Sequence, residues 1–143
     1  MIKLPKSFFP KQPKYRNTKV TSGSITFDSK LEERRYYQLR NDPDVVNIEV
    51  HPVFDIFPET KNQIDGKMVT FQKITYIADF KVTYKNGKIE AEDVKGHMTE
   101  VFNIKRKLFE AAYPDLTIKI VRLDDIKREH DKYMERIKKH ATN

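Results

Sequence analysis

The sequence contains no cysteine and no apolar run long enough to cross a membrane. Without cysteine the chain forms no disulfide, holds no metal through thiolates and has no cysteine nucleophile. A spanning helix needs about 20 apolar residues, and the N-terminus also lacks the apolar segment of a signal peptide. We therefore expect a protein of the cytoplasm with no membrane partner.

Acidic residues are outnumbered by basic ones: 21 Asp and Glu stand against 28 Lys and Arg, which gives a net charge of +7. An excess of this size predicts a polyanionic partner, and nucleic acid is the first candidate. The alternative is a basic but otherwise ordinary protein. The length of 143 residues corresponds to one domain.

Acidic residues are absent altogether from residues 1–27, which hold six Lys or Arg and three prolines. Proline excludes a long helix or a central strand there. We predict a basic arm over residues 1–26 and a single domain over 27–143. The arm could lie along phosphates through Lys14, Arg16 and Lys19, or it could be a disordered terminus.

The first half of the domain predicts one helix and a series of strands. Ser29 and Glu32 have the spacing of a capping box, so a helix is expected over 29–41. Residues 45–58 predict one or two strands, and the polar segment 59–67 predicts a loop with a turn at Asp65-Gly66. The longest alternating pattern, residues 69–84, predicts one strand that returns through an Asn86-Gly87 hairpin as strand 88–95.

The second half predicts two helices around one more strand. Helix 99–112 is expected to bury a stripe that contains Val101, Ile104 and Leu108. Strand 117–123 follows, and helix 124–140 is expected to turn Ile126, Tyr133, Met134 and Ile137 inward. Helix 99–112 is interpreted as a crossover connection, which makes strand 117–123 parallel to 88–95. The fold class is therefore α/β, with a mixed sheet flanked by helices.

Four ionisable residues stand where this fold could gather them: Asp79, Asp93, Lys95 and Glu32. Two close carboxylates repel each other unless a cation lies between them. Oxygen ligands without cysteine suit Mg²⁺ or Mn²⁺, and a neighbouring lysine could position or deprotonate a water. Structural ion pairs and a helix cap at Glu32 would explain the same residues without catalysis.

The motifs Tyr76-Ile77-Ala78-Asp79-Phe80 and Glu92-Asp93-Val94-Lys95-Gly96 resemble those of the PD-(D/E)XK nuclease superfamily. Together with Phe27–Glu32 and Ile104–Phe109, they look like a phage-encoded family of Holliday-junction resolvases. The motif order is also similar to that of phage endonuclease I. The resemblance covers about residues 25–123 and implies a restriction-endonuclease-like fold.

The resemblance implies a metal-dependent endodeoxyribonuclease that cuts branched DNA as a homodimer. Asp79, Asp93, Glu32 and the Val94 carbonyl would bind Mg²⁺ or Mn²⁺, and Lys95 would be the catalytic lysine. Lys105 and Arg106 on the following helix would hold phosphates. The alternatives are a nucleic-acid-binding protein of the same fold without catalysis, and a restriction-like or transposase-like endonuclease that acts on linear duplex.

A metal site shared by Asp79 and Asp93 requires a particular register of the hairpin. A two-residue loop at Asn86-Gly87 would place Asp79 opposite Val94, so Asp79 and Asp93 would point to different faces of the sheet. A three-residue loop, Lys85-Asn86-Gly87 with a left-handed glycine, would bring them opposite each other. We predict that longer loop, or a bulge with the same effect.

Overall fold

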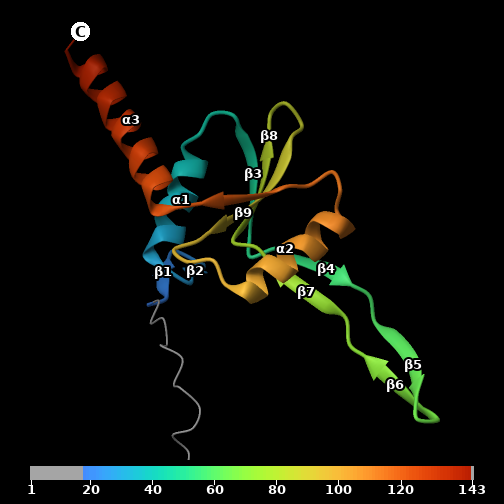
Figure 1. Ribbon diagram of the computed structural model, residues 1–143. Helices are drawn as coiled ribbons and strands as arrows, with labels where there is room; N and C mark the ends of the chain where they lie inside the picture. Colours follow the sequence, from blue (N-terminus) through green and yellow to red (C-terminus); the bar gives the residue numbers. More distant parts are fainter. Residues whose placement is uncertain (1–17, 143) are drawn as a thin grey trace, which may run out of the picture.

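The computed structural model describes residues 18–142. In that part of the chain, strands β1 and β2 precede helix α1, eight further strands and helix α2 follow, and helix α3 comes last (Figure 1). The helices are α1 (Lys30–Arg40), α2 (Glu100–Ala112) and α3 (Leu123–Ala141). The strands are β1 (Val20–Ser22), β2 (Ile25–Phe27), β3 (Val45–Val50), β4 (Val53–Phe57), β5 (Thr60–Ile64), β6 (Lys67–Phe71), β7 (Ile74–Ile77), β8 (Phe80–Tyr84), β9 (Ile89–Val94) and β10 (Ile118–Val121).

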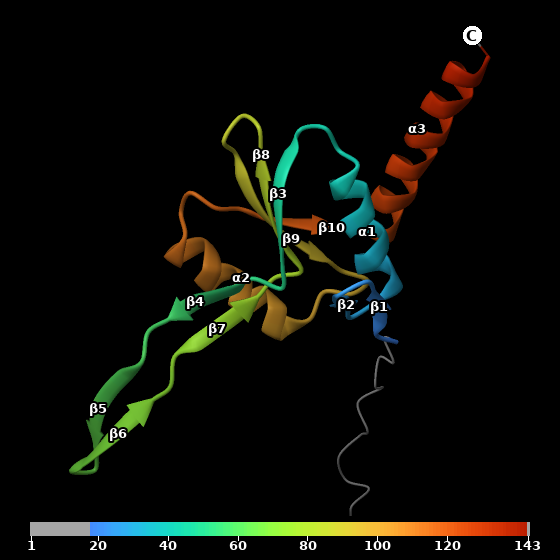
Figure 2. The ribbon, with the colours of Figure 1, turned by 180° about the vertical axis from the view of Figure 1, so that it is seen from behind.

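The central sheet has the strand order β10-β9-β8-β3. β10 runs parallel to β9, and the other two pairings are antiparallel, so the mixed α/β fold and the parallel crossover are confirmed. Phe80 and Val82 face α1, where they pack with Leu39. Ala91 and Ile118 face α2, where they pack with Phe109, Tyr76 and Phe54. The two helices therefore cover opposite faces of the sheet (Figure 2).

The expected single strand over 69–84 is wrong, because the chain breaks at Ala78-Asp79 between β7 and β8. β8 pairs with β3, whereas β7 pairs with β4, and the β3–β4 chain turns at His51-Pro52. The two breaks face each other: the His51 N–H donates to the Asp79 carbonyl (2.9 Å), and the Ala78 N–H donates to the Pro52 carbonyl (3.2 Å). Asp79 therefore lies at a kink rather than in the middle of a strand.

The expected polar loop over 59–67 is also wrong. Residues 60–71 form the antiparallel hairpin β5–β6, which extends the β4–β7 pair away from the body of the protein (Figure 1). The turn prediction holds, since Asp65 and Gly66 connect the two strands with positive φ angles of 51° and 76°. We call residues 53–77 the ribbon arm.

The helix boundaries agree with the sequence, but two of the buried faces differ from it. α2 buries Phe102 and Phe109, while Val101 and Ile104 of the expected stripe are exposed. In α3 only Ile126 is buried. Tyr133, Met134 and Ile137, which were expected to face inward, are exposed because α3 extends beyond the body of the protein (Figure 1).

The segment expected to be an arm contains a short β1–β2 hairpin at its C-terminal end. Lys19 is exposed just before this hairpin, and Lys14 and Arg16 lie outside the described residues. No helix among residues 18–142 has the length and apolar character needed to cross a membrane.

Candidate active site

The β8–β9 hairpin has the register that a shared acidic site requires. Thr83 pairs with Ile89 and Phe80 with Glu92, so the ladder continues to Asp79 opposite Asp93. The loop is Lys85-Asn86-Gly87: the Tyr84 N–H donates to the Lys88 carbonyl (2.9 Å), and Gly87 has a φ of 83°. The predicted three-residue loop with a left-handed glycine is confirmed.

The carboxylates of Asp79 and Asp93 are each fixed by a hydrogen bond from the protein. Asp79 Oδ2 accepts from the Val94 backbone N–H at 2.6 Å. Asp93 Oδ2 accepts a short hydrogen bond from the Tyr76 hydroxyl, and its Oδ1 lies 2.9 Å from Lys95 Nζ. Asp93 is only 2% exposed, so its orientation is set by these contacts rather than by water.

Lys95 follows β9 directly, and its backbone N–H donates to the Val121 carbonyl of β10 (3.0 Å). Its ammonium group lies between the Asp93 carboxylate and the face of the Phe102 ring, 4.6 Å from the ring centroid. Both contacts hold the ammonium group in one position. The Asp93–Lys95 spacing of two residues thus brings acid and base together, as the sequence predicted.

The pKa of Asp79 is strongly perturbed in the folded protein. Burial raises the pKa of its carboxyl group to about 8, and the negative charges of Asp93 and Glu32 add to this effect. The Val94 N–H and the Lys95 charge act in the opposite direction but do not cancel it. Three carboxylates are therefore close enough to repel one another, which is the situation that a bound cation would relieve.

Glu32 belongs to this cluster although it also serves its own helix. Ser29 Oγ caps α1 by accepting from the Glu32 N–H (3.2 Å), as the capping-box spacing predicts. In a complete capping box the glutamate side chain also accepts from the N–H of the capping residue, here Ser29. In this helix Glu32 Oε2 accepts instead from the N–H of the preceding residue, Asp28, at 3.0 Å. The side chain is buried, with 6% of the residue exposed. Glu32 therefore both stabilises the start of α1 and contributes negative charge to the acidic site.

Two residues near the site were not singled out from the sequence: Asp28 and His51. His51 Nε2 lies 3.4 Å from Glu32 Oε2 and 3.9 Å from Asp28 Oδ2, and one ligand atom from each residue falls within 4.8 Å of the others. His51 has a φ of 51°, which is uncommon for a residue other than glycine. The neighbouring Pro52 was the one available sequence signal for a break in this strand.

A buried ion pair fixes α1, and with it Glu32, against the sheet. Arg35 donates to both carboxylate oxygens of Glu92 at 2.7 Å, and Arg35 and Glu92 are 4% and 0% exposed. Burial alone would lower the pKa of Arg35, but the interactions with Glu92 and Glu129 outweigh it and raise the pKa further. Because β9 alternates, Glu92 points to α1 and Asp93 to α2.

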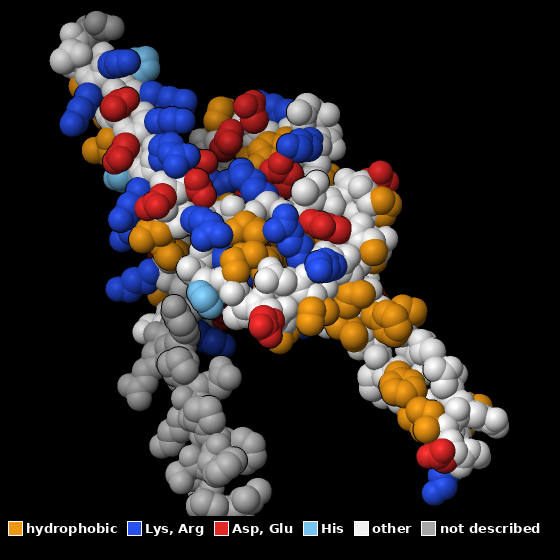
Figure 3. Space-filling view, in the orientation of Figure 1, with side chains coloured by type: hydrophobic (Ala, Val, Ile, Leu, Met, Phe, Trp, Pro, Cys, Tyr) orange, Lys and Arg blue, Asp and Glu red, His pale blue; other side chains and the backbone are white. Residues whose placement is uncertain are grey.

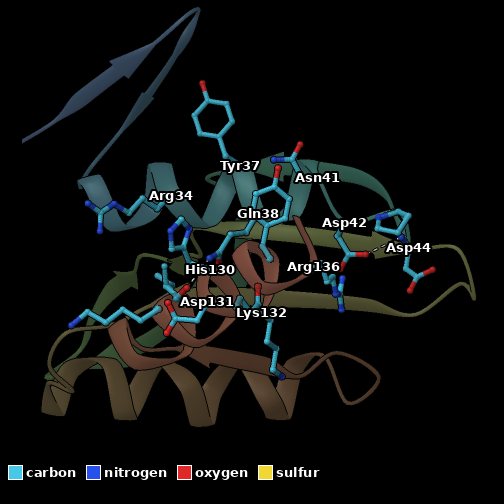
Figure 4. Close-up of a pocket in the computed structure, with 15 residues that line it drawn as sticks. Arg34, Tyr37, Gln38, Asn41, Asp42, Asp44, His130, Asp131, Lys132 and Arg136 are labelled. Carbon is cyan, nitrogen blue, oxygen red and sulfur yellow. Dashed lines mark hydrogen bonds between the residues drawn. The ribbon is translucent and has the colours of Figure 1, made fainter. Parts of the chain in front are cut away.

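The predicted phosphate contacts, Lys105 and Arg106, lie on α2, the helix that also places Phe102 beside Lys95. Lys105 and Arg106 are both half-buried, and Arg106 Nε forms an ion pair with Glu110 Oε1 at 3.0 Å. A hollow of about 920 Å³ lies elsewhere, between α1, the loop that follows it and α3 (Figure 4). Its lining includes Tyr37 and Tyr133 but none of the acidic residues of the cluster.

Comparison with protein families matches residues 12–135 to the family described as "Protein of unknown function (DUF1064)". The chain belongs to this family. The match spans every element from β1 to the greater part of α3, so the site and the projecting helix both lie within the shared region. Searches of curated proteins and of solved structures gave no match.

Proposed function

We propose that this member of the DUF1064 family is a metal-dependent endodeoxyribonuclease that hydrolyses phosphodiester bonds in branched DNA. The observation that carries the proposal is the kink at which Asp79, Asp93 and Glu32 come together beside the Lys95 ammonium group. The resemblance to the PD-(D/E)XK nucleases and the net charge of +7 point in the same direction.

The residues at the kink fit a hard divalent cation. They offer carboxylate oxygens, which Mg²⁺ and Mn²⁺ prefer. The pKa of Asp79 is raised by burial and, in addition, by the negative charges of Asp93 and Glu32. Asp79 and Asp93 would hold the cation, with Glu32 reaching it from α1. The Val94 carbonyl remains a predicted fourth ligand. A cation bound there would polarise a phosphate oxygen and make a coordinated water more acidic.

Neighbouring groups of the protein orient the two aspartates, and Lys95 supplies a positive charge beside them. The Tyr76 hydroxyl and the Val94 N–H hold one oxygen each of Asp93 and Asp79. The second oxygen of Asp93 lies 2.9 Å from Lys95 Nζ, so a ligand bound there would be shared with the lysine. Lys95 can donate a hydrogen bond to a phosphate oxygen and stabilise the negative charge that develops there. His51 extends the donor set, because its Nε2 lies 3.4 Å from Glu32 Oε2 and 3.9 Å from Asp28 Oδ2.

The deciding experiment is a cleavage assay on a four-way junction and on a linear duplex of matched sequence, with Mg²⁺ and with Mn²⁺. We expect cleavage of the junction by wild type, and a loss on the order of 10²-fold or more for Asp93→Asn and Lys95→Ala. Asp93→Asn keeps an acceptor for Tyr76, so folding is preserved. Glu135→Gln, an exposed acid on α3, is the matched control and should cleave normally.

Absence of cleavage on every DNA form would refute the nuclease and favour a binding protein of the same fold. Full activity of both site variants would refute the assignment of the site. Equal cleavage of junction and linear duplex would refute only the branched-DNA preference and favour a restriction-like enzyme. Cation binding is measured separately, as the rise in Tm that Mg²⁺ or Mn²⁺ gives to wild type but not to Asp93→Asn.

A further inference from the structure

The ribbon arm starts at the candidate active site. β4 begins directly after the turn at His51-Pro52, and β7 ends two residues before Asp79. The turn at Gly66 lies 13 residues from Asp79 along the chain, which allows a reach of at most roughly 40 Å in extended conformation. Figures 1 and 2 both show the arm leaving the body of the protein from this region. DNA bound at the site would therefore lie next to the root of the arm.

The outer part of the arm, the β5–β6 hairpin, has no acidic residue in either strand. Each strand has five residues, and Lys61 and Lys67 are among them. Over residues 60–73, Asp65 in the turn is the single acid against three lysines, which gives a net charge of +2. The part of the arm that projects furthest thus has the sign of charge that suits phosphates.

Both faces of this hairpin carry polar side chains mixed with apolar ones. One face consists of Lys61, Gln63, Met68 and Thr70, all of them exposed. The opposite face consists of Thr60, Asn62, Ile64, Lys67, Val69 and Phe71. Figure 3 shows apolar side chains along the arm among uncharged ones. Neither face is the continuous apolar centre of a flat protein interface, whereas a partner that encloses the hairpin would contact both.

These side chain types suit the edges of DNA bases. Amide and hydroxyl groups form hydrogen bonds with base edges and phosphates, and apolar groups contact the methyl group of thymine. The major groove is about 12 Å wide and admits a two-stranded β-ribbon. A two-stranded hairpin is only marginally stable in water, so a groove that surrounds it also stabilises its extended form.

We propose that the β5–β6 hairpin enters the major groove of the duplex next to the bond that the protein cuts. The walls of the groove contact both faces of the hairpin, and Lys61 and Lys67 bind phosphates at its edges. The reach of the arm corresponds to about 12 base pairs at 3.4 Å each. The inference rests on the proposed function for the identity of DNA as the bound polymer.

The first test is the salt dependence of binding to a four-way junction, measured without metal so that nothing is cut. Each lost phosphate contact lowers the slope of log K against log salt concentration by about 0.9. We expect Lys61→Gln with Lys67→Gln to lower the slope by about two units, and the affinity at ~0.15 M salt by about tenfold or more. Lys138→Gln with Lys139→Gln removes the same charge from the exposed end of α3 and should leave the slope unchanged.

The second test is methylation interference on the same junction, which identifies the groove. Dimethyl sulfate methylates guanine at N7, in the major groove, and adenine at N3, in the minor groove. For wild type we expect interference from guanines within about 12 base pairs of the branch point and none from adenines there. Gln63→Glu with Thr70→Glu places two negative charges on one exposed face of the hairpin and should abolish that interference. Circular dichroism checks that each variant is folded.

An unchanged slope in the Lys61 and Lys67 variant, or an equal loss of slope in the α3 control, would overturn the proposal. Interference from adenine N3 instead of guanine N7 would do the same, because it places the hairpin in the minor groove. Self-association of wild type that the Gln63 and Thr70 variant loses while it keeps its DNA contacts would assign the hairpin to a protein partner.

Failure of this inference and failure of the proposed nuclease are distinguishable, because both binding tests are made without metal. A major-groove contact without cleavage in Mg²⁺ refutes only the nuclease. Cleavage in Mg²⁺ without a contact of the hairpin refutes only the role of the arm.

Discussion

Replacing Asp79 by asparagine should make the metal-free protein more stable at pH 8 while it removes cleavage. The carboxyl group of Asp79 has an ordinary pKa of 3.8 and a pKa of about 8 in the folded protein. Between these values the unfolded chain releases the proton and the folded chain keeps it. The unfolding free energy of wild type therefore falls by about 1.4 kcal/mol for each pH unit in this window.

By pH 8, where the folded carboxyl group is about half ionised, the loss amounts to about 5 kcal/mol, which is the upper limit of what asparagine can recover at that pH. Asparagine keeps an acceptor for the Val94 N–H, but its amide NH₂ group must be buried at a cost of about 1–3 kcal/mol. We therefore expect a net gain of about 2–4 kcal/mol at pH 8. At pH 4, at the lower end of the window, Asp79→Asn should give no gain, because the loss of wild-type stability with pH has only begun there.

The assay is urea unfolding of wild type and Asp79→Asn in EDTA at pH 4, 6 and 8, followed by circular dichroism. The difference in unfolding free energy should grow with pH in favour of the variant. Adding Mg²⁺ at pH 8 should stabilise wild type more than the variant. A difference that stays constant from pH 4 to pH 8 would refute the reasoning, because burial and the neighbouring carboxylates would then not raise the pKa of Asp79 in the folded protein.

Two further predictions concern the supports of the site. Arg35→Met should cost about 3–5 kcal/mol in urea unfolding because it leaves Glu92 buried without its partner, and Arg35→Met with Glu92→Leu should recover most of that loss. Gly87→Val should cost more than about 1 kcal/mol, since a β-branched residue is strained at a φ of 83°. Native-state hydrogen exchange of the β8–β9 amides would show whether the register is also weakened.

The elements with strong local signals could be predicted from the sequence. The cap at Ser29 begins α1, and the stop before Pro114 ends α2 close to where each was expected. The hairpin register needed a further argument, because Asn86-Gly87 by itself predicts a two-residue loop. The requirement that Asp79 and Asp93 share a face led to the three-residue loop that the structure shows.

The faces of α2 and α3 could not be predicted from periodicity alone. In α2 two stripes compete, and the one that contains Phe102 and Phe109 is buried because these rings pack with Phe54 and Tyr76. Aromatic side chains bury more area than Val101 or Ile104 could in the same place. In α3 the apolar stripe is real, but a pattern does not say whether another element covers it.

The site depends on the break between β7 and β8, which the alternation of apolar and polar residues does not reveal. Ala78 and Asp79 continue the pattern of β7 and β8 without interruption, so no periodicity argument places a break between them. The break arises because the two strands pair with different partners, β4 and β3, which diverge at His51-Pro52. Long-range pairing of this kind is set by tertiary packing, which also explains why His51 was missed.

The kink explains how an acidic side chain can be held rigidly at the end of a sheet. The Val94 N–H donates to the Asp79 side chain, and the Asp79 N–H and carbonyl bond with Glu92 and His51. The carboxylate therefore substitutes for a backbone acceptor beside Val94. A side chain used in this way cannot turn toward solvent without leaving a backbone N–H unpaired, which costs about 1–3 kcal/mol. Repulsion from Asp93 and Glu32 is thus retained in the folded state, and this is the reason for proposing a cation as the ligand of the site.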